Sequence, residues 1–287
     1  MLIQRKQTLC DIVLRTNIGR LDHILTHIDE FYKEFKEFKR DKYGNLRTNK
    51  PKYVKKFGQY QTRTINPPKG ELKSVQKRIN KYLSEHISMP EYAFGGVKGK
   101  DNIQNAYSHK GQKYVFQTDL KDFYPFITSK MVYQMFVRIG FSADVSRILT
   151  RLTTYKGHLP QGAPTSTTIA NLVFEPTGRK LQKLAEENKL RFTTFVDDVT
   201  MSSQSQFKDL TPLAIRILEE DGYRISQNKT TYKSGITEIT GVKMTNNSMT
   251  TTSKFNAKYE NADNMPLSTK NGMDNYKHRI KIIAKGQ

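Results

Sequence analysis

The feature that most constrains this chain is a pair of adjacent acids between two short apolar runs. Residues 193–201 read TTFVDDVTM, with β-branched and aromatic side chains on both sides of Asp197 and Asp198. Two such runs around a short polar interruption predict a β-hairpin. Carboxylates beside apolar residues lose hydration unless something compensates them, and a divalent metal ion is one such compensation. A solvated Asp-Asp turn is the alternative interpretation.

A second acidic strand end lies upstream of this hairpin. Residues 114–118 (YVFQT) predict a strand that leads into Asp119, and Asp122 follows three residues later. If this strand lies beside the hairpin, Asp119, Asp197 and Asp198 meet on one sheet edge. There they could hold two magnesium ions for a nucleotidyl transfer reaction. Asp122 is better explained as the cap of a helix start than as a ligand.

The charge of the chain points to a polyanionic partner. Its 48 Lys and Arg residues outnumber its 27 Asp and Glu residues, which gives a net charge of +21. An excess of this size predicts binding to nucleic acid. An anionic membrane surface is the competing partner, but the sequence has no run of about 18 apolar residues that could span a bilayer. It also shows no basic amphipathic helix with a wide apolar face, so no membrane partner is expected.

The cysteine content and the N-terminal sequence predict a cytoplasmic protein. The single cysteine, Cys10, excludes an internal disulfide and a cysteine-rich zinc site, and we expect it to be a small packed apolar residue. The first residues lack the apolar core and the cleavage site of a signal peptide.

The apolar spacing along the chain predicts mixed α and β structure. Gly95, Gly96 and Gly99 mark a loop. An order of strand, helices, hairpin, helix and strand differs from a βαβ alternation, and it suits an antiparallel sheet with helices on one face, as in a polymerase palm. The predicted helices cover residues 1–40, 71–87, 129–140, 143–155, 164–187, 210–221 and an amphipathic end at 276–284, and the predicted strands cover 60–65, 114–118 and a pair across 236–244.

Several sequence blocks, in a fixed order, resemble those of a known family. Residues 119–125 (DLKDFYP), 159–166 (LPQGAPTS) and 195–198 (FVDD) resemble motifs A, B and C of reverse transcriptases. Residues 63–67 (RTINP) are similar to the fingers segment of prokaryotic members. Residues 105–109 (NAYSH) match the NAxxH block of retron enzymes, and residues 239–241 (ITG) are similar to their VTG block. On this likeness, the chain resembles the retron-type (prokaryotic) reverse transcriptases.

The resemblance implies an α+β, right-hand polymerase fold. N-terminal helices and fingers would cover residues 1–110, and a palm, with finger elements and motifs A to E, would cover residues 111–245. A short or partial thumb would cover residues 246–287. Only 46 residues follow Gly241 (287 − 241), fewer than a full retron thumb usually needs. The tail would form a minimal thumb, or a partner protein or bound RNA would complete the clamp.

The resemblance also implies the metal and catalytic residues. Asp119 and Asp197 would be ligands of two Mg2+ ions, and Leu120 would lie with them in the metal site. Asp198 would be a nearby carboxylate that acts more through its charge than as a ligand. The three aspartates form the implied catalytic set.

Five residues are implied to contact the nucleotide: Arg63, Phe123, Tyr124, Gln161 and Lys229. Tyr124 takes the place of the steric gate, an aromatic ring that excludes a 2′-hydroxyl group; an ordinary core aromatic is the alternative. A guanidinium fork at Arg63 would clamp the triphosphate. Gln161 would contact the incoming nucleotide or the template. Lys229 stands at the motif D lysine that would protonate pyrophosphate, and a surface lysine is the alternative.

The two retron-like blocks imply a role in RNA contact or in the local scaffold for Asn105, His109, Thr240 and Gly241. No second histidine stands at metal-ligand spacing from His109, so a zinc site is not expected. One departure from the family lies before the paired acids, where most retron enzymes carry Tyr-Ala and this chain carries Phe-Val at residues 195–196. The valine adds bulk close to the primer end, so processivity or substrate preference is expected to differ.

The implied function is RNA-directed DNA synthesis from deoxynucleoside triphosphates. A bound structured non-coding RNA would be the template and the primer, and an RNA–DNA hybrid would be the product. The resemblance further implies antiphage defence together with an effector protein. Two alternatives stay open: another bacterial defence reverse transcriptase that makes short or untemplated DNA, and a catalytically idle RNA-binding scaffold.

Overall fold

The computed structural model describes residues 3–38, 62–245, 247–262 and 265–285. The chain divides into two compact units. The first unit consists of Met1–Ser88 and Tyr124–Val173, and the second consists of Met89–Phe123 and Phe174–Gln287. Two helices cross a boundary between the units: α5 (Phe123–Phe126) and α8 (Ser166–Glu187). The predicted division at residues 110 and 245 stays a prediction.

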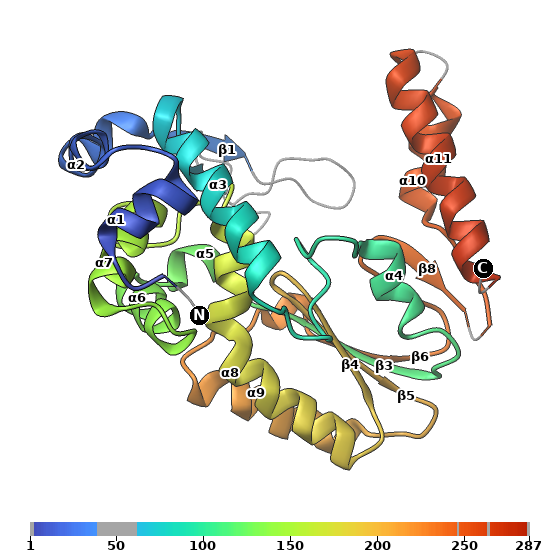
Figure 1. Ribbon diagram of the computed structural model, residues 1–287. Helices are drawn as coiled ribbons and strands as arrows, with labels where there is room; N and C mark the ends of the chain where they lie inside the picture. The colour runs from blue at the N-terminus through green and yellow to red at the C-terminus, as the bar shows by residue number, and fades with distance from the viewer. Residues whose placement is uncertain (1–2, 39–61, 246, 263–264, 286–287) are drawn as a thin grey trace, which may run out of the picture. The chain divides into compact units, whose positions relative to one another are not determined.

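The first unit is mainly helical (Figure 1). Side-chain caps explain where several of its helices begin, because an N-cap oxygen satisfies a backbone N–H group that the helix leaves free. Asn17 accepts from the Arg20 N–H group, Thr128 from that of Met131, and Ser142 from that of Val145. Besides parts of α5 and α8, its elements are α1 (Lys6–Thr8), the π-helix η1 (Leu9–Leu14), α2 (Ile18–Thr26), the 3-10 helix η2 (Ile28–Phe31), β1 (Phe35–Phe38), β2 (Thr62–Ile65), α3 (Gly70–His86), α6 (Ser129–Arg138) and α7 (Ala143–Thr153).

The helix predicted over residues 1–40 is wrong at its end. The chain leaves the helical region at Tyr32, and Phe35–Phe38 form β1, which pairs antiparallel with β2. Phe35 lies opposite Ile65, and both phenylalanines of β1 are about half exposed. The pairing partner lies far along the chain, so local apolar spacing does not reveal it. The predicted strand over 60–65 is confirmed from Thr62 onward, and its first two residues lie outside the described ranges.

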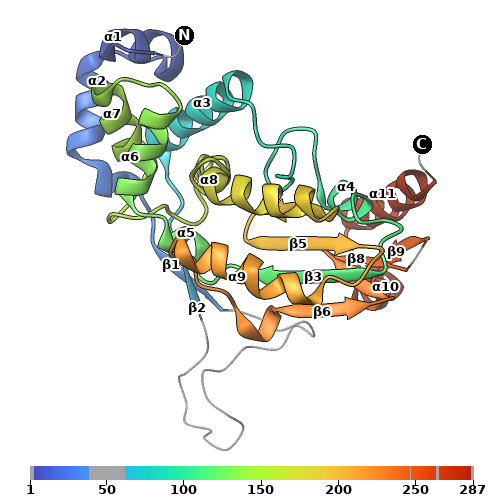
Figure 2. The same cartoon turned by 90° about the horizontal axis from the view of Figure 1, so that it is seen from below.

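The second unit is built on a four-stranded antiparallel sheet. Its order is β4-β5-β3-β6, so β3 and β5 are the central strands. In the view of Figure 2, α9 and the C-terminal half of α8 run across the same face of this sheet. The strands are β3 (Tyr114–Asp119), β4 (Arg191–Phe195), β5 (Asp198–Ser203) and β6 (Thr231–Ser234), and the accompanying helices are η3 (Lys208–Leu210), α9 (Thr211–Glu220) and η4 (Gln227–Lys229). This arrangement confirms the predicted antiparallel sheet with helices on one face.

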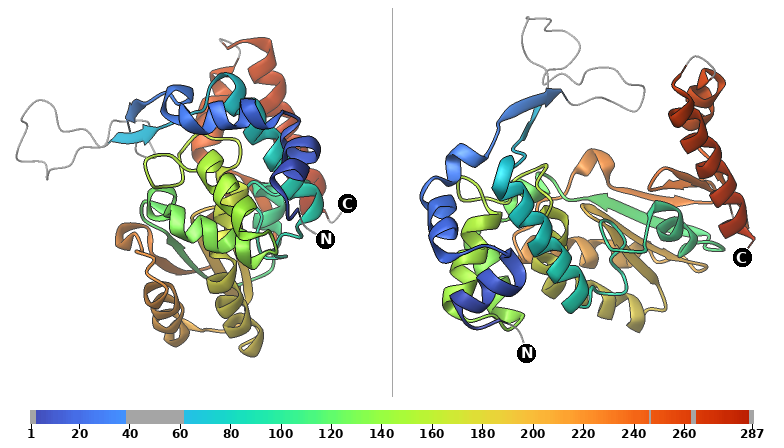
Figure 3. Two further views of the ribbon diagram at one scale, coloured as in Figure 1. Left: turned by 60° about the vertical axis from the view of Figure 1, so that its left-hand side comes forward. Right: turned by 45° about the horizontal axis from the view of Figure 1, so that its top comes forward.

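A smaller sheet and the C-terminal helices complete the second unit (Figure 3). The three strands β7, β8 and β9 pair antiparallel, and their buried side chains pack with Ile103 of α4 and Ile280 of α11. The predicted strand pair across 236–244 and the amphipathic end at 276–284 are confirmed; β6, β9 and α10 had no sequence prediction. The bounds are α4 (Asn102–Tyr107), β7 (Thr237–Ile239), β8 (Val242–Met244), β9 (Met249–Thr251), α10 (Ser253–Glu260) and α11 (Leu267–Ala284). Among the described residues, no helix has the length and apolar character to cross a membrane.

Candidate active site

Three carboxylates meet at one end of the four-stranded sheet. Asp198 is the first residue of β5, and Asp197 belongs to the turn that joins β4 to β5. Asp119 is the last residue of β3 and lies directly opposite Asp198 in the β3–β5 register. The Leu120 N–H group donates to the Asp197 carbonyl oxygen over 2.8 Å, which ties the end of β3 to the hairpin turn. The hairpin and the pairing that the sequence suggested are therefore present.

The proximity of these charges shifts the titration of Asp198. Burial, together with the negative charges of Asp197 and Asp119, raises the pKa of its carboxyl group to about 7, while the positive charge of Lys229 acts in the opposite direction. A carboxyl group gains a raised pKa when its charged form is poorly solvated and lies near like charges. The sheet end therefore holds more negative charge than its own cation compensates.

Asp119 is held by two side chains of the segment that follows α9. The Ser226 hydroxyl donates to Asp119 Oδ1 over 2.6 Å, and the Ser226 N–H group donates to the Asp119 carbonyl oxygen over 2.8 Å. The Lys229 ammonium group forms an ion pair with Asp119 Oδ2. The Lys229 side chain is 48% exposed and that of Asp119 is 8% exposed. Lys229 thus reaches inward from η4 and acts as the counter-charge of a nearly buried carboxylate.

The donor chemistry of this sheet end fits a divalent cation. Hard cations take carboxylate oxygens as ligands, and a cation here would offset the repulsion that raises the pKa of Asp198. Within the described ranges, no three His, Cys, Asp or Glu side chains are already arranged around one metal position. Lys229 forms an ion pair with Asp119 Oδ2. A cation that binds to this oxygen must therefore displace the Lys229 ammonium group from it.

Gly95 packs closely against the turn that carries Asp197, a role that the sequence did not predict. Residues 92–94 run beside β4, where the Thr194 N–H group donates to the Tyr92 carbonyl oxygen over 2.8 Å. A Cβ atom on Gly95 would lie 2.6 Å from the Val196 backbone nitrogen and 2.6 Å from Val196 Cγ2. Val196 itself has a φ angle of 60°, which is strained for a β-branched residue. The Gly95-Gly96 pair in the sequence is the signal that marks this close approach.

The remaining residues of motif A differ in their surroundings. Leu120 and Phe123 are buried, and Phe123 packs against the rings of Phe174 and Tyr223 at centroid distances of 6.1 Å in both cases. Asp122 directly precedes α5 with a φ angle of 52°, and its carboxylate lies 3.6 Å from the Arg224 guanidinium group. Its place before α5 agrees with the predicted helix start.

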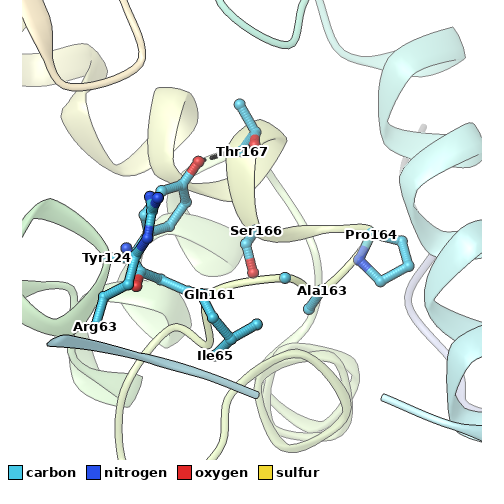
Figure 4. Close-up of a pocket in the computed structure, with 9 residues that line it drawn as sticks. Arg63, Ile65, Tyr124, Gln161, Ala163, Pro164, Ser166 and Thr167 are labelled. Atoms are coloured by element: carbon cyan, nitrogen blue, oxygen red, sulfur yellow. Dashed lines mark hydrogen bonds between the residues drawn. The ribbon is translucent and has the colours of Figure 1, made fainter. Parts of the chain in front are cut away.

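The first unit contains a cavity that collects most of the predicted nucleotide-binding residues (Figure 4). Its volume is about 410 Å³. The Asn66 N–H group donates to the Gln161 carbonyl oxygen over 2.8 Å, so the segment after β2 is tied to the motif B loop. A Cβ atom on Gly162, where φ is 92°, would lie 2.9 Å from Ile65 Cγ2. The lining residues are Arg63, Ile65, Tyr124, Gln161, Gly162, Ala163, Pro164, Ser166 and Thr167.

Arg63 and Tyr124 have defined partners around this cavity. Arg63 Nε lies 2.7 Å from Glu37 Oε2, and both side chains are about half exposed. The two hydroxyl groups of Tyr124 and Thr167 are 3.0 Å apart. The cavity therefore offers a guanidinium group, an amide side chain and an aromatic ring, which are groups that suit a phosphate, a base and a sugar.

His109 is part of the protein core. Its Nδ1 atom lies 2.6 Å from Ser202 Oγ, and its Nε2 atom lies 2.8 Å from Thr193 Oγ1. Complete burial lowers its pKa to about 3, with a smaller contribution from the charge of Arg191, so the ring is neutral at pH 7. The neutral imidazole connects β4 to β5, the two strands that flank the Asp197 turn.

The two retron-like blocks are in contact within the second unit. Asn105 Nδ2 donates to Thr240 Oγ1 over 3.2 Å, and Asn102 Nδ2 donates to the Thr240 carbonyl oxygen over 2.9 Å. Thr240 and Gly241 both have positive φ angles, 44° and 80°. The structure thus brings the NAxxH block of α4 against the tight turn between β7 and β8.

Comparison with known families identifies the class of protein. The sequence profile described as reverse transcriptase (RNA-dependent DNA polymerase) matches residues 50–256. The chain belongs to this family, and the predicted α+β, right-hand polymerase fold is confirmed. Members of the family generally use divalent metal ions.

The curated relatives place the chain among the retron-type members. Retron Se72 reverse transcriptase of Salmonella heidelberg (strain 579083-10) is 36% identical over 192 residues, which are 67% of this chain and 45% of that protein. Retron Ec86 reverse transcriptase of Escherichia coli is 32% identical over 178 residues, 61% of this chain and 56% of that protein. Retron Mx65 reverse transcriptase of Myxococcus xanthus is 29% identical over 202 residues, 63% and 47% of the two chains. The chain spans about half the length of these relatives.

The similarity to solved structures is lower than that to the curated relatives. Telomerase from Candida albicans, solved with a fragment of telomeric RNA, is 11% identical, with a TM-score of 0.48 over 82% of this chain and 51% of the other. A foamy viral protease-reverse transcriptase, solved with double-stranded DNA, is 17% identical, with a TM-score of 0.44 over 89% of this chain and 38% of the other.

Proposed function

We propose that this chain is an RNA-directed DNA polymerase that copies a bound, structured non-coding RNA. The observation that carries the proposal is the sheet end of the second unit, where Asp119 lies opposite Asp198 and beside the Asp197 turn. The raised pKa of Asp198 supports it, because a site with surplus negative charge is suited to bind cations. Retron-type relatives with the same activity in their names support the assignment of template and product classes.

In this proposal Asp119 and Asp197 hold two Mg2+ ions beside the backbone of Leu120. Asp198 contributes negative charge more than a ligand bond. When bound, such ions activate the attacking 3′-oxygen and stabilise the leaving pyrophosphate. Lys229 would then have a second role. Once a cation replaces its ammonium group at Asp119, that group is available to donate a proton to the pyrophosphate.

The cavity of the first unit would receive the deoxynucleoside triphosphate. Arg63 offers two parallel N–H donors to phosphate oxygens, which a lysine cannot do. Gln161 would contact the nucleotide or the template base beside it. The Tyr124 ring would lie under the sugar and exclude a 2′-hydroxyl group. Phe123, which is buried, would contribute through its backbone and by fixing the start of α5.

The RNA partner is proposed from charge and from the two retron-like blocks. A net charge of +21 favours binding to a long polyanion and makes that binding strongly dependent on salt. Thr240 and Gly241, which are not buried, would present the RNA contact, while the buried Asn105 supports Thr240 and the buried His109 joins β4 to β5 as parts of the local scaffold. By likeness to retrons, the RNA would also prime synthesis, the product would be an RNA–DNA hybrid, and the system would act in antiphage defence with an effector protein.

The experiment that tests this function measures deoxynucleotide incorporation on a primed RNA template with Mg2+. Wild-type protein is compared with Asp197→Asn and with the matched control Asp122→Asn, whose carboxylate pairs with Arg224 on the surface. We expect the first substitution to lower incorporation by at least about a hundredfold, since it removes a metal ligand, and the second to change it less than about threefold. Equal activity of wild type and Asp197→Asn would refute the site. A wild type that binds RNA tightly but incorporates nothing would favour the scaffold hypothesis.

A further inference from the structure

The cavity of the first unit contains a hydrogen bond between two hydroxyl groups. The Tyr124 hydroxyl lies 3.0 Å from Thr167 Oγ1, and in Figure 4 the Tyr124 ring extends from one wall of the cavity toward Thr167 on α8. Both side chains are partly buried. Tyr124 belongs to motif A, five residues after Asp119, whereas Thr167 directly follows motif B, 48 residues after Asp119 (167 − 119). The bond therefore joins two segments that lie far apart in the sequence.

Thr167 stands on a firmly held turn. The neighbouring Ser166 hydroxyl donates to the Pro160 carbonyl oxygen over 2.6 Å, and the neighbouring Thr168 hydroxyl donates to Asn80 Oδ1 over 2.6 Å. These bonds fix the first turn of α8 to the motif B loop and to α3. A β-branched side chain in a helix also has few χ1 rotamers. The position of Thr167 Oγ1 is therefore well defined. The Tyr124 ring, in contrast, can rotate about two side-chain bonds.

We propose that Thr167 is a positioning residue for sugar selection. Its hydroxyl group holds the Tyr124 ring in the one orientation in which that ring occupies the space of a 2′-hydroxyl group. Loss of this bond removes one restraint on the orientation of the ring, so a ribonucleotide is admitted more readily. The inference rests on the proposed polymerase function. In it, the selection of deoxynucleotides depends on Thr167 of α8 as well as on the Tyr124 ring of motif A.

The test measures kcat/KM for a deoxynucleotide and for the ribonucleotide with the same base, on the same RNA template. One neutral hydrogen bond corresponds to about a two- to tenfold effect on an equilibrium. We therefore expect Thr167→Val to lower the preference for the deoxynucleotide about two- to tenfold, mainly through a lower KM for the ribonucleotide. Thr167→Ser, which keeps the hydroxyl group, should retain the preference.

A double-substitution cycle separates positioning from general damage. Tyr124→Phe removes the same bond from the other side, so it should match Thr167→Val, and the double variant should be no worse than either single variant. Thr177→Val is the matched control, because it removes a hydroxyl group of the same helix, away from the cavity, whose partner is Asp221, and it should leave the preference unchanged. Additive effects of Thr167→Val and Tyr124→Phe, or an equal loss in Thr177→Val, would overturn the proposal.

A binding measurement distinguishes a failure of this proposal from a failure of the proposed function. The melting temperature is measured with saturating dATP or ATP and Ca2+ for wild type and Thr167→Val. If no variant incorporates nucleotides but dATP stabilises wild type more than ATP does, and this difference shrinks in Thr167→Val, the positioning role stands and the polymerase function fails. If the two nucleotides stabilise wild type equally, or the difference persists in Thr167→Val, the positioning role fails.

Discussion

Replacement of Gly95 by alanine should disturb the hairpin that carries Asp197 and Asp198 more than the small volume of the added methyl group suggests. The added Cβ atom would lie 2.6 Å from the Val196 nitrogen and 3.0 Å from the Phe195 carbonyl carbon. These are backbone atoms of the turn that carries Asp197, so the clash cannot be relieved by rotating a side chain. The segment that contains Gly95 is itself tied to β4 through Phe94, whose N–H group donates to the Thr194 carbonyl oxygen over 2.9 Å.

The expected size of the effect follows from these contacts. Overpacking by one carbon in a rigid environment costs about 1–3 kcal/mol of unfolding free energy. For a unit of this size, that corresponds to a fall of about 2–12 °C in melting temperature. A shift of the turn by about 1 Å moves the carboxylate of Asp197 relative to the rest of the site, and displacements of that size lower rates by about a hundredfold. We therefore expect Gly95→Ala to lower kcat by about ten- to a hundredfold.

Two other glycines provide controls for this measurement. A Cβ atom on Gly178 would clash with the Tyr92 hydroxyl oxygen, so Gly178→Ala should destabilise the same segment but lower kcat less than Gly95→Ala does. Gly272 in α11 has open space around its Cβ position, and Gly272→Ala should leave the rate unchanged and slightly raise stability. The assays are thermal unfolding and primer extension at saturating nucleotide. A Gly95→Ala protein with wild-type kcat and melting temperature would refute the argument that this glycine positions the hairpin.

Three further changes test other parts of the site. Lys229→Gln removes the counter-charge of Asp119 and should lower the melting temperature in EDTA by about 2–4 °C, with a smaller loss in saturating Mg2+. The pKa of His109 is about 3 in the folded chain, below its ordinary value near 6.5, so its neutral ring stabilises the fold fully above pH 6.5, and this contribution is lost as the pH falls toward 3. His109→Asn removes this titration. Its unfolding free energy, measured in urea from pH 7 to pH 4, should therefore fall less steeply than that of wild type. Arg63→Lys should raise KM for deoxynucleotides about tenfold with a smaller change in kcat, since it loses the guanidinium fork, and an unchanged KM in steady-state extension would remove Arg63 from the triphosphate site.

Local sequence pattern was sufficient for the elements that carry the carboxylates. The hairpin around Asp197 and the strand that ends at Asp119 are each defined by a few consecutive residues, and their pairing followed from the resemblance of the ordered motifs. The α8 helix was also predictable, since its apolar spacing runs over its whole length after Pro164.

Contacts between residues far apart in the sequence were not predictable in the same way. The partners of His109 lie 84 and 93 residues away, so no local pattern indicates that this ring joins β4 to β5. The ion pair between Lys229 and Asp119 spans 110 residues. Strand β1 was mistaken for helix because its pairing with β2 outweighs the helical spacing that precedes it. The close approach of Gly95 to Val196 likewise depends on tertiary packing.

The most direct test of the central claim asks whether an RNA base determines which nucleotide is added. Single deoxynucleotides are offered, one at a time, on four RNA templates that differ only in the base next to the primer end, with Asp197→Asn as the inactive control. An RNA-directed DNA polymerase adds the complementary deoxynucleotide on each template, and the substitution abolishes every addition. Addition of the same nucleotide on all four templates would contradict templated synthesis and favour the enzyme class that makes untemplated DNA.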